Sequence, residues 1–226
     1  MFCICRIQVK ARADIKKGEE ITTQYMPTTS KGTYHRRKEM EQMWCFKCSC
    51  VVCKDPTEVG TMFSALKCPV CEGEEVEGYL LPMDSLNPNS TWRCKICNFT
   101  QTITEVLNQT SEMENLLDRS LQKYQISDNG DAPELKETLL MLQEVFHDNH
   151  FLIVKLKQKL GVVLGNKPGC DDLENISKEL ILQKLSLCQD VIKVKSKLEK
   201  GFSGKWKNIV DNEINKCLEE LSKRVQ

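Results

Sequence analysis

Apolar residues recur at steps of three or four along the second half of the chain, in five stretches separated by breaks. This spacing is the periodicity of an amphipathic helix. Thr102 and Glu105 match a capping box that begins the first stretch, and Pro133 suits a helix start after a break at 129–131. Breaks at 165–169 and 201–204 separate the later stretches. The apolar stripes are Val106, Met113, Leu117, Leu121 and Tyr124; Leu135, Leu139, Leu142 and Phe146; Ile153, Leu156, Leu160 and Val163; Ile176, Leu180, Leu187, Val191, Val194 and Leu198; and Trp206, Val210, Ile214, Leu218, Leu221 and Val225.

Each of these stripes covers only part of its helix surface. Helices of this kind pack against one another in an antiparallel arrangement, and do not form one long coiled coil. The helix-turn-helix rhythm predicts an α-helical array of tetratricopeptide-like type, although no strict sequence repeat is visible.

The first 44 residues show a different pattern. Residues 4–12 alternate apolar and polar, with Ile7, Val9 and Ala11 on one face, which predicts a strand. A turn at Gly18 and a second short strand reaching Tyr25 are expected next. Residues 33–44 are rich in helix formers and predict a short helix.

Eight cysteines lie in closely spaced groups between positions 45 and 97. Two-residue gaps allow both thiolates of a pair to reach one metal ion, and thiolates are the ligands Zn²⁺ prefers in closed tetrahedral sites. By count, eight sulfurs predict two structural zinc sites. Residues 79–81 and 91–93, joined by a turn at 87–90, predict a hairpin between the two later pairs. The cysteines are Cys45, Cys48, Cys50, Cys53, Cys68, Cys71, Cys94 and Cys97.

Charge is balanced, with 32 basic and 32 acidic residues, so composition indicates no general attraction to nucleic acid or anionic membranes. No apolar run approaches the roughly 20 residues of a membrane span, and the start lacks the layout of a signal peptide. We therefore expect an intracellular protein, in the cytoplasm or nucleus. Thiols stay reduced there, and the odd total of 13 cysteines also argues against a disulfide framework. Cys3, Cys5, Cys170, Cys188 and Cys217 are interpreted as small apolar residues.

Two motifs in this order resemble the end of a SET domain and its post-SET cysteine loop. They are Gly18-Glu-Glu-Ile-Thr-Thr-Gln-Tyr25 and the Cys-x-Cys-x-x-Cys run from Cys48 to Cys53. With the helical tail, the whole chain resembles the C-terminal portion of a SET and MYND domain-containing protein-lysine methyltransferase. The extra cysteine pairs are similar to the arthropod-type branch of that family.

The resemblance implies roles for particular residues. Tyr25 matches the active-site tyrosine, placed where the lysine amine meets the methyl group of S-adenosylmethionine, and Phe46 matches an aromatic that packs on the cofactor's adenine. Cys48, Cys50 and Cys53 match three post-SET zinc ligands. Read without the family, Tyr25 is an ordinary packing residue and Phe46 covers the zinc site.

Several family features find no match in this sequence. The family's fourth post-SET ligand belongs to an Asn-His-x-Cys segment, which contacts the cofactor together with a glycine-rich stretch. Neither is present, and the MYND zinc finger is also absent. Asn149-His150 lies in the helical tail, so we interpret it as a chance match and both His147 and His150 as helix-end residues. Cys45 is next to Cys48, Cys50 and Cys53 in the sequence, so it is the candidate for the fourth ligand of their zinc site.

The sequence therefore predicts an α+β chain in three parts: the C-terminal end of a SET domain (1–44), a post-SET and zinc-ribbon-like region (45–100) and an α-helical domain (101–226). Zn²⁺ is the expected structural ion. We expect a fragment or isoform of a SET-domain lysine methyltransferase acting on a histone or another protein. It should be inactive on its own, because most of the pocket for S-adenosylmethionine is missing. The alternative is a zinc-stabilised protein-interaction module, and a zinc-dependent nucleic-acid binder is a weaker third option.

Overall fold

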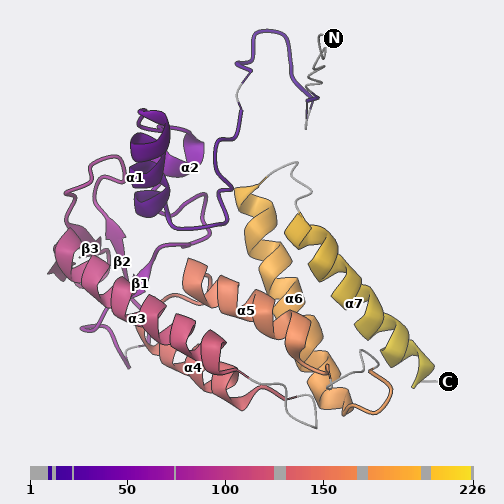
Figure 1. The fold of residues 1–226 in the computed structure, drawn as a ribbon. Coiled ribbons are helices and arrows are strands. Elements are labelled where there is room, and N and C mark those ends of the chain that lie inside the picture. The colour runs from indigo at the N-terminus through magenta and orange to yellow at the C-terminus, as the bar shows by residue number, and fades with distance from the viewer. Residues whose placement is uncertain are drawn as a thin grey trace.

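The computed structural model describes residues 10–11, 14–21, 23–73, 75–124, 131–166, 173–199 and 205–224. Within them lie seven helices and a small antiparallel sheet, which confirms the α+β class (Figure 1). The elements, in order, are α1 (Thr33–Trp44), α2 (Val51–Lys54), β1 (Leu66–Lys67), β2 (Tyr79–Pro82), β3 (Trp92–Cys94), β4 (Thr100–Gln101), α3 (Ile103–Lys123), α4 (Pro133–Val145), α5 (Phe151–Val163), α6 (Lys178–Leu198) and α7 (Lys205–Lys223).

The sheet is a meander in which each strand pairs antiparallel with the next, in the order β1-β2-β3-β4. Leu80 on β2 pairs with Leu66 on one side and with Cys94 on the other, which defines the register of the β1–β2 and β2–β3 pairings. The hairpin predicted from the sequence is β2–β3. The outer strands β1 and β4 were not predicted, because two-residue strands are too short to show an alternating pattern.

The two strands expected before residue 26 have different outcomes. The predicted strand 4–12 falls almost entirely outside the described residues. The second was wrong: the described residues from Asp14 to Tyr25 form a turn at Lys17 and Gly18 and contain no strand. A strand is stabilised by pairing with a neighbour, and these residues are exposed, with no strand beside them in the described chain.

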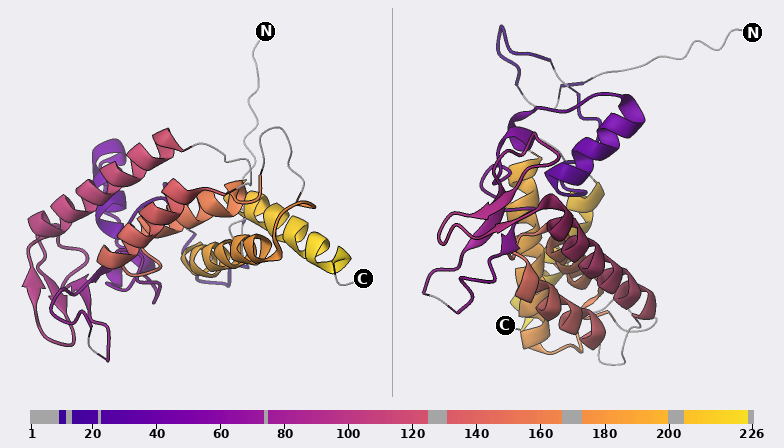
Figure 2. Two further views of the ribbon diagram at one scale, coloured as in Figure 1. Left: turned by 90° about the horizontal axis from the view of Figure 1, so that it is seen from below. Right: turned by 90° about the vertical axis from the view of Figure 1, so that its left-hand side faces the viewer.

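All five predicted helices of the second half are present. Thr102 and Glu105 form the expected capping box at the start of α3, and Pro133 is the first residue of α4. Helix α5 is apolar around most of its circumference, so it lies at the centre, in contact with α3, α4, α6 and α7. Figure 1 and Figure 2 show α3 beside α4 and α6 beside α7, with α5 between these pairs. Their tetratricopeptide-like character stays a prediction.

The sheet and the helices share one apolar core. Leu66 of β1 bridges Phe146 at the end of α4, and the Phe151 amide donates to the Phe63 carbonyl at 2.9 Å. One buried cluster runs from Val52 and the sheet cysteines through α3, α4 and α5 to Val210 of α7. The cysteine region is therefore fixed to the helical tail by packing, while the predicted domain boundaries stay predictions.

In the part of the chain that the structure describes, no helix combines the length and the apolar character that a membrane crossing requires.

Candidate metal sites and the Tyr25 cluster

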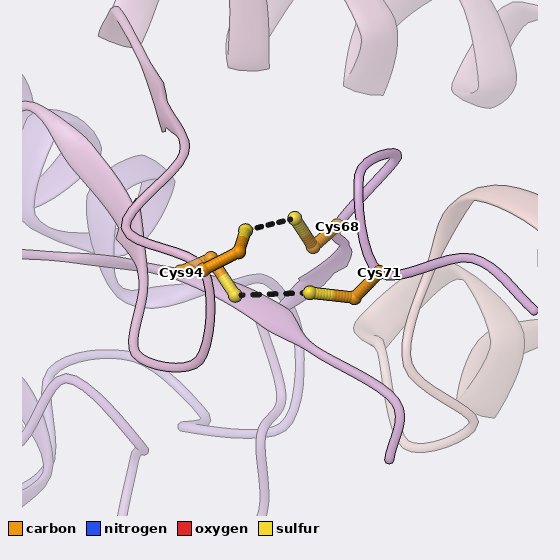
Figure 3. Close-up of side chains that lie close together, drawn as sticks. Cys68, Cys71 and Cys94 are labelled. Carbon is orange, nitrogen blue, oxygen red and sulfur yellow. Dashed lines mark hydrogen bonds between the residues drawn. The ribbon is translucent and has the colours of Figure 1, made fainter. Parts of the chain in front are cut away.

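Four cysteine sulfurs converge beside the sheet. Cys68 follows β1, Cys94 ends β3, and Cys71 and Cys97 complete the two pairs, with all four sulfurs within 4.8 Å of one another. The Cys68–Cys97 and Cys71–Cys94 sulfur distances are 3.5 and 3.8 Å. Figure 3 shows Cys68, Cys71 and Cys94 directed toward one another. A tetrahedral ZnS₄ site with bonds of about 2.3 Å has edges of about 3.8 Å. The four side chains therefore fit one Zn²⁺.

The surroundings of this four-cysteine site also suit a metal. A Cβ added at Gly78 would lie 2.7 Å from the sulfurs of both Cys71 and Cys94, so only glycine leaves the sulfurs room. Burial, together with the neighbouring thiols, raises the pKa of Cys71 to about 12. Without metal this thiol keeps its proton, and Zn²⁺ must displace it on binding.

A second group consists of Cys48, Cys50 and Cys53, whose sulfurs also lie within 4.8 Å of one another. Cys50 is the residue before the short helix α2, and that single turn brings Cys53 back toward it. Arg37 Nε donates to the Cys48 carbonyl at 2.8 Å, and Ser85 Oγ donates to the Cys53 carbonyl at 2.8 Å. These bonds fix the loop against α1 and the β2–β3 connection. Three thiolates suit Zn²⁺ with one ligand still to be supplied.

Cys45 does not belong to either cluster. It ends α1 in the left-handed conformation, with φ 57° and its amide bonded to the Glu41 carbonyl, and it is exposed. Its sulfur is not among those that come within 4.8 Å of Cys48, Cys50 and Cys53. Its role as fourth ligand stays a prediction to which this geometry adds no support.

Tyr25 and Phe46 lie together, as the resemblance implies for residues around one pocket. The ring centroids of Tyr25 and Phe46 are 4.9 Å apart in an edge-on arrangement, and those of Tyr25 and Trp44 are 5.7 Å apart, also edge-on. Tyr25 remains 51% exposed and Trp44 39% exposed. We call Tyr25, Trp44 and Phe46 the Tyr25 cluster. Trp44 was not predicted from the sequence, although its place two residues before Phe46, at the end of α1, was an available signal.

The helical tail holds the segment that follows Tyr25. Thr28 Oγ1 donates to the Leu198 carbonyl at 2.9 Å, and the amide and hydroxyl of Thr29 both donate to Glu199 Oε1. Trp206 Nε1 donates to the other carboxylate oxygen of Glu199 at 3.2 Å. Glu199 therefore joins the end of α6, the start of α7 and the Tyr25 segment. Nothing in the sequence pattern indicated this contact, which spans 170 residues.

His147 and His150 are helix-end residues, as expected. His150 is the N-cap of α5, where its Nδ1 accepts from the Leu152 amide, and its ring stacks on Phe146 at 3.8 Å. Burial holds the pKa of His150 well below its ordinary value, so the ring is neutral at pH 7. Both histidines lie outside the cysteine clusters.

Comparison with known proteins finds relatives that are SET domain-containing proteins. No family model matches the chain. The chain is 37% identical over 89 residues to the Drosophila melanogaster SET domain-containing protein SmydA-8, isoform A, which covers 39% of this chain and 18% of that protein. Isoform B matches at 35% identity over 91 residues, covering 40% of this chain and 19% of that protein. The alignments thus span less than a fifth of the length of these relatives. They confirm the resemblance expected from the motifs. Along about 40% of its length, this chain is a homologue of SET domain-containing proteins.

Proposed function

We propose that this chain forms the C-terminal part of a SET-domain protein-lysine N-methyltransferase. The full protein transfers a methyl group from S-adenosylmethionine to a lysine of a histone or another protein. The observation that carries the proposal is the Tyr25 cluster. Tyr25 and Phe46, matched separately to the reacting centre and to the adenine, lie 4.9 Å apart directly before the three-cysteine group.

The chemistry asked of these residues is positioning. Bound S-adenosylmethionine would supply an activated methyl group for transfer to an uncharged lysine amine. Tyr25 would position that amine, and Phe46 would hold the aromatic part of the cofactor. Alignment of this kind provides a large share of the rate in such reactions. The Glu199 contacts hold the Tyr25 segment in place, which gives the helical tail a supporting role.

The 226-residue chain by itself is proposed to be inactive. Half of the Tyr25 surface is exposed, and among the described residues its aromatic neighbours are Trp44 and Phe46, which provide a single wall. One open wall cannot enclose a cofactor or exclude water from the reacting atoms.

Calorimetric titration of the zinc-loaded chain with S-adenosylmethionine, beside a radiolabelled methyl-transfer assay, tests this proposal. We expect two zinc ions per chain, no detectable cofactor binding and no transfer. Micromolar binding or turnover by this chain contradicts its inactivity. The same assay on the longest product of the locus tests the family activity: Tyr25→Phe should lower its rate about 100-fold or more, while Tyr124→Phe, at the end of α3, should keep it.

A second candidate function is a zinc-stabilised protein-interaction module without catalysis. Exposed apolar side chains in the part of the chain that also holds Trp44 and Phe46 favour it, since Met43 is 61% and Val51 73% exposed. Where such side chains form one patch, the patch often marks a protein contact. If the longest product shows neither cofactor binding nor methyl transfer, this second function replaces the first.

A further inference from the structure

The buried side of helix α1 carries a charged side chain. Thr33, Arg36 and Met40 are the buried residues of this helix, and Arg36 is only 1% exposed. Helix α1 contacts the short helix α2, which holds Cys53 (Figure 1). A buried ion pair generally adds little to stability compared with apolar residues of similar volume. Packing alone therefore does not account for an arginine at this position.

Hydrogen bonds fix the orientation of the Arg36 guanidinium. Its Nη1 donates to the carbonyls of Thr28 and Lys31 at 3.1 and 2.7 Å. The same nitrogen lies 3.4 Å from Glu58 Oε1, so the carboxylate pairs with this branch of the side chain. Because a guanidinium is planar and rigid, these contacts also set the direction of its other branch.

The other branch of Arg36 faces a sulfur of the three-cysteine group. Nη2 donates to Thr33 Oγ1 at 2.9 Å and lies 3.9 Å from Cys53 Sγ, close to the outer limit of an N–H···S contact. Cys53 is 1% exposed, and its sulfur lies within 4.8 Å of those of Cys48 and Cys50. Among the contacts of Nη2 in the described chain, this sulfur is the group that can carry a negative charge.

A bound metal ion would make this contact important. Three thiolates and one Zn²⁺ leave one negative charge in excess. Cys50 is exposed and Cys48 is half-buried, so water can reach these two residues, whereas Cys53 is buried away from it. A thiolate at Cys53 therefore needs a partner within the protein. The nearby guanidinium provides one, since opposite charges attract more strongly in a buried site than in water.

We propose that Arg36 is the positioning residue of the three-cysteine zinc site. Its charge stabilises the thiolate of Cys53 and holds that sulfur beside those of Cys48 and Cys50. The inference rests on zinc binding by this group and does not require methyl transfer. Because Nη1 also binds the carbonyls of Thr28 and Lys31, one side chain links the zinc site to the segment that follows Tyr25.

Cadmium-113 NMR on the whole chain tests this role. Cd²⁺ replaces Zn²⁺ at cysteine sites, and centres with four and with three sulfurs give separate signals. A competing chelator then removes the metal from each site, so the four-cysteine site is an internal reference for folding. Arg36→Met, which removes the charge, should weaken metal binding at the three-cysteine site about 10- to 100-fold and leave the four-cysteine site unchanged. Lys38→Met, on the exposed side of α1, is the matched control and should bind like the parent chain.

Two further variants separate charge from structure, and they serve if Arg36→Met does not fold. Arg36→Lys keeps the charge but loses the fork, so it should weaken the three-cysteine site by about threefold to tenfold. Glu58→Gln removes the competing carboxylate and keeps an acceptor for Thr33, so affinity at the three-cysteine site should stay or rise. If Arg36 only supported the fold, breaking its pair with Glu58 from either side would be equally damaging.

The possible failures are distinct. A parent chain that shows the four-sulfur signal alone overturns both the zinc prediction for Cys48, Cys50 and Cys53 and the role of Arg36. If the parent chain binds two ions but both Arg36 variants match Lys38→Met, the zinc prediction stands and the role of Arg36 is wrong. A parallel loss at both sites, or a loss in Glu58→Gln as large as in the Arg36 variants, also contradicts the proposal.

Discussion

Gly78 shows how one residue can set the geometry of the four-cysteine site. It precedes β2, and its missing side chain leaves room for the sulfurs of Cys71 and Cys94. The Cys68 amide also donates to the Gly78 carbonyl at 2.8 Å, so the glycine backbone positions the first ligand pair. One atom at this position would therefore disturb both pairs together.

We expect Gly78→Ala to weaken zinc binding, because the new Cβ must displace two sulfurs from a tetrahedral arrangement. Forced shifts in a packed site cost about 1–3 kcal/mol, which corresponds to a loss of affinity of about 5-fold to about 150-fold. Competition with a chromogenic chelator measures this loss. Val76→Ala, in the same turn and 62% exposed, is the control. Equal affinities of the two variants would show that the four sulfurs tolerate the added atom.

The buried ring of His150 makes the stability of the protein depend on pH. In the unfolded protein His150 binds a proton near its ordinary pKa of about 6.5, whereas burial in the folded protein lowers that pKa well below this value. The unfolded state therefore binds more protons below pH 6.5, and the free energy of unfolding falls as the pH decreases. The loss approaches about 1.4 kcal/mol per pH unit for this one group.

His150→Asn should reduce that slope, since asparagine can also cap α5 but does not titrate. Urea unfolding at pH 7.5 and 5.5, with zinc in excess, provides the measurement. The variant should be less stable at pH 7.5, because the ring on Phe146 is lost, but should lose less on acidification. His35, whose pKa is lowered to about 4 mainly by burial, still contributes to the slope in both proteins. An unchanged slope would show that His150 does not control the acid response.

At the scale of single elements, helix α3 follows from its sequence more fully than any other element. The Thr102 hydroxyl accepts from the Glu105 amide at 3.3 Å, and the Glu105 carboxylate accepts from the Thr102 amide at 2.7 Å. Both donors would otherwise be unsatisfied at the helix start. The signal is local, so four consecutive residues were enough to predict it.

Thr102→Ala should lower the free energy of unfolding by about 1 kcal/mol. Thr104→Ala changes the same residue type two positions later, where the side chain is exposed and outside the capping box, and should cost less. Chemical denaturation of both variants decides between them. If Thr104→Ala is as damaging as Thr102→Ala, the capping box is not what stabilises this end of α3.

The sequence predicted elements well where the signal was local. The helix at 33–44 and the β2–β3 hairpin formed as expected, because helix propensity and a turn at 87–90 act within a few residues. The strand predicted before Tyr25 was wrong, because a strand needs a pairing partner and no local sequence pattern supplies one. At the candidate sites, the spacing of the cysteines correctly predicted that Cys68, Cys71, Cys94 and Cys97 lie together. It could not place Trp44 beside Tyr25 or provide Glu199 as the partner of Thr29.

At the scale of the whole molecule, the cysteine region and the helical tail are expected to unfold together. Cys68, Cys71 and Cys94 belong to the same buried cluster as Leu135, Leu152 and the other core residues of α3–α7. A zinc site that holds the sheet therefore also supports the surface on which the sheet packs against α4 and α5.

Zinc removal should therefore lower the melting temperature of the helices, and not only that of the sheet. Structural zinc commonly contributes a large part of the folding free energy of such segments. Circular dichroism at 222 nm, with and without chelator, follows the helices. Cys97→Ser should bind one zinc fewer, whereas Cys188→Ala should keep the parent zinc content, since Cys188 lies buried between α5 and α6. Identical helix melting with and without zinc would mean that the two parts unfold independently.

The sequence by itself determined the helices, their breaks, the hairpin and the metal-binding character of the paired cysteines. Helix capping, apolar periodicity and two-residue cysteine gaps all act between residues close in the chain, so one sequence is enough to predict them. Tertiary structure alone decided that Trp44 and Phe46 pack against Tyr25, that Glu199 holds Thr29 from 170 residues away, and that Cys45 lies apart from the other three cysteines of its run. It also decided that Glu58 is buried, where its carboxylate accepts from Thr33 and pairs with Arg36. These features depend on the packing of α1, the sheet and the helical tail against one another, which no local pattern encodes.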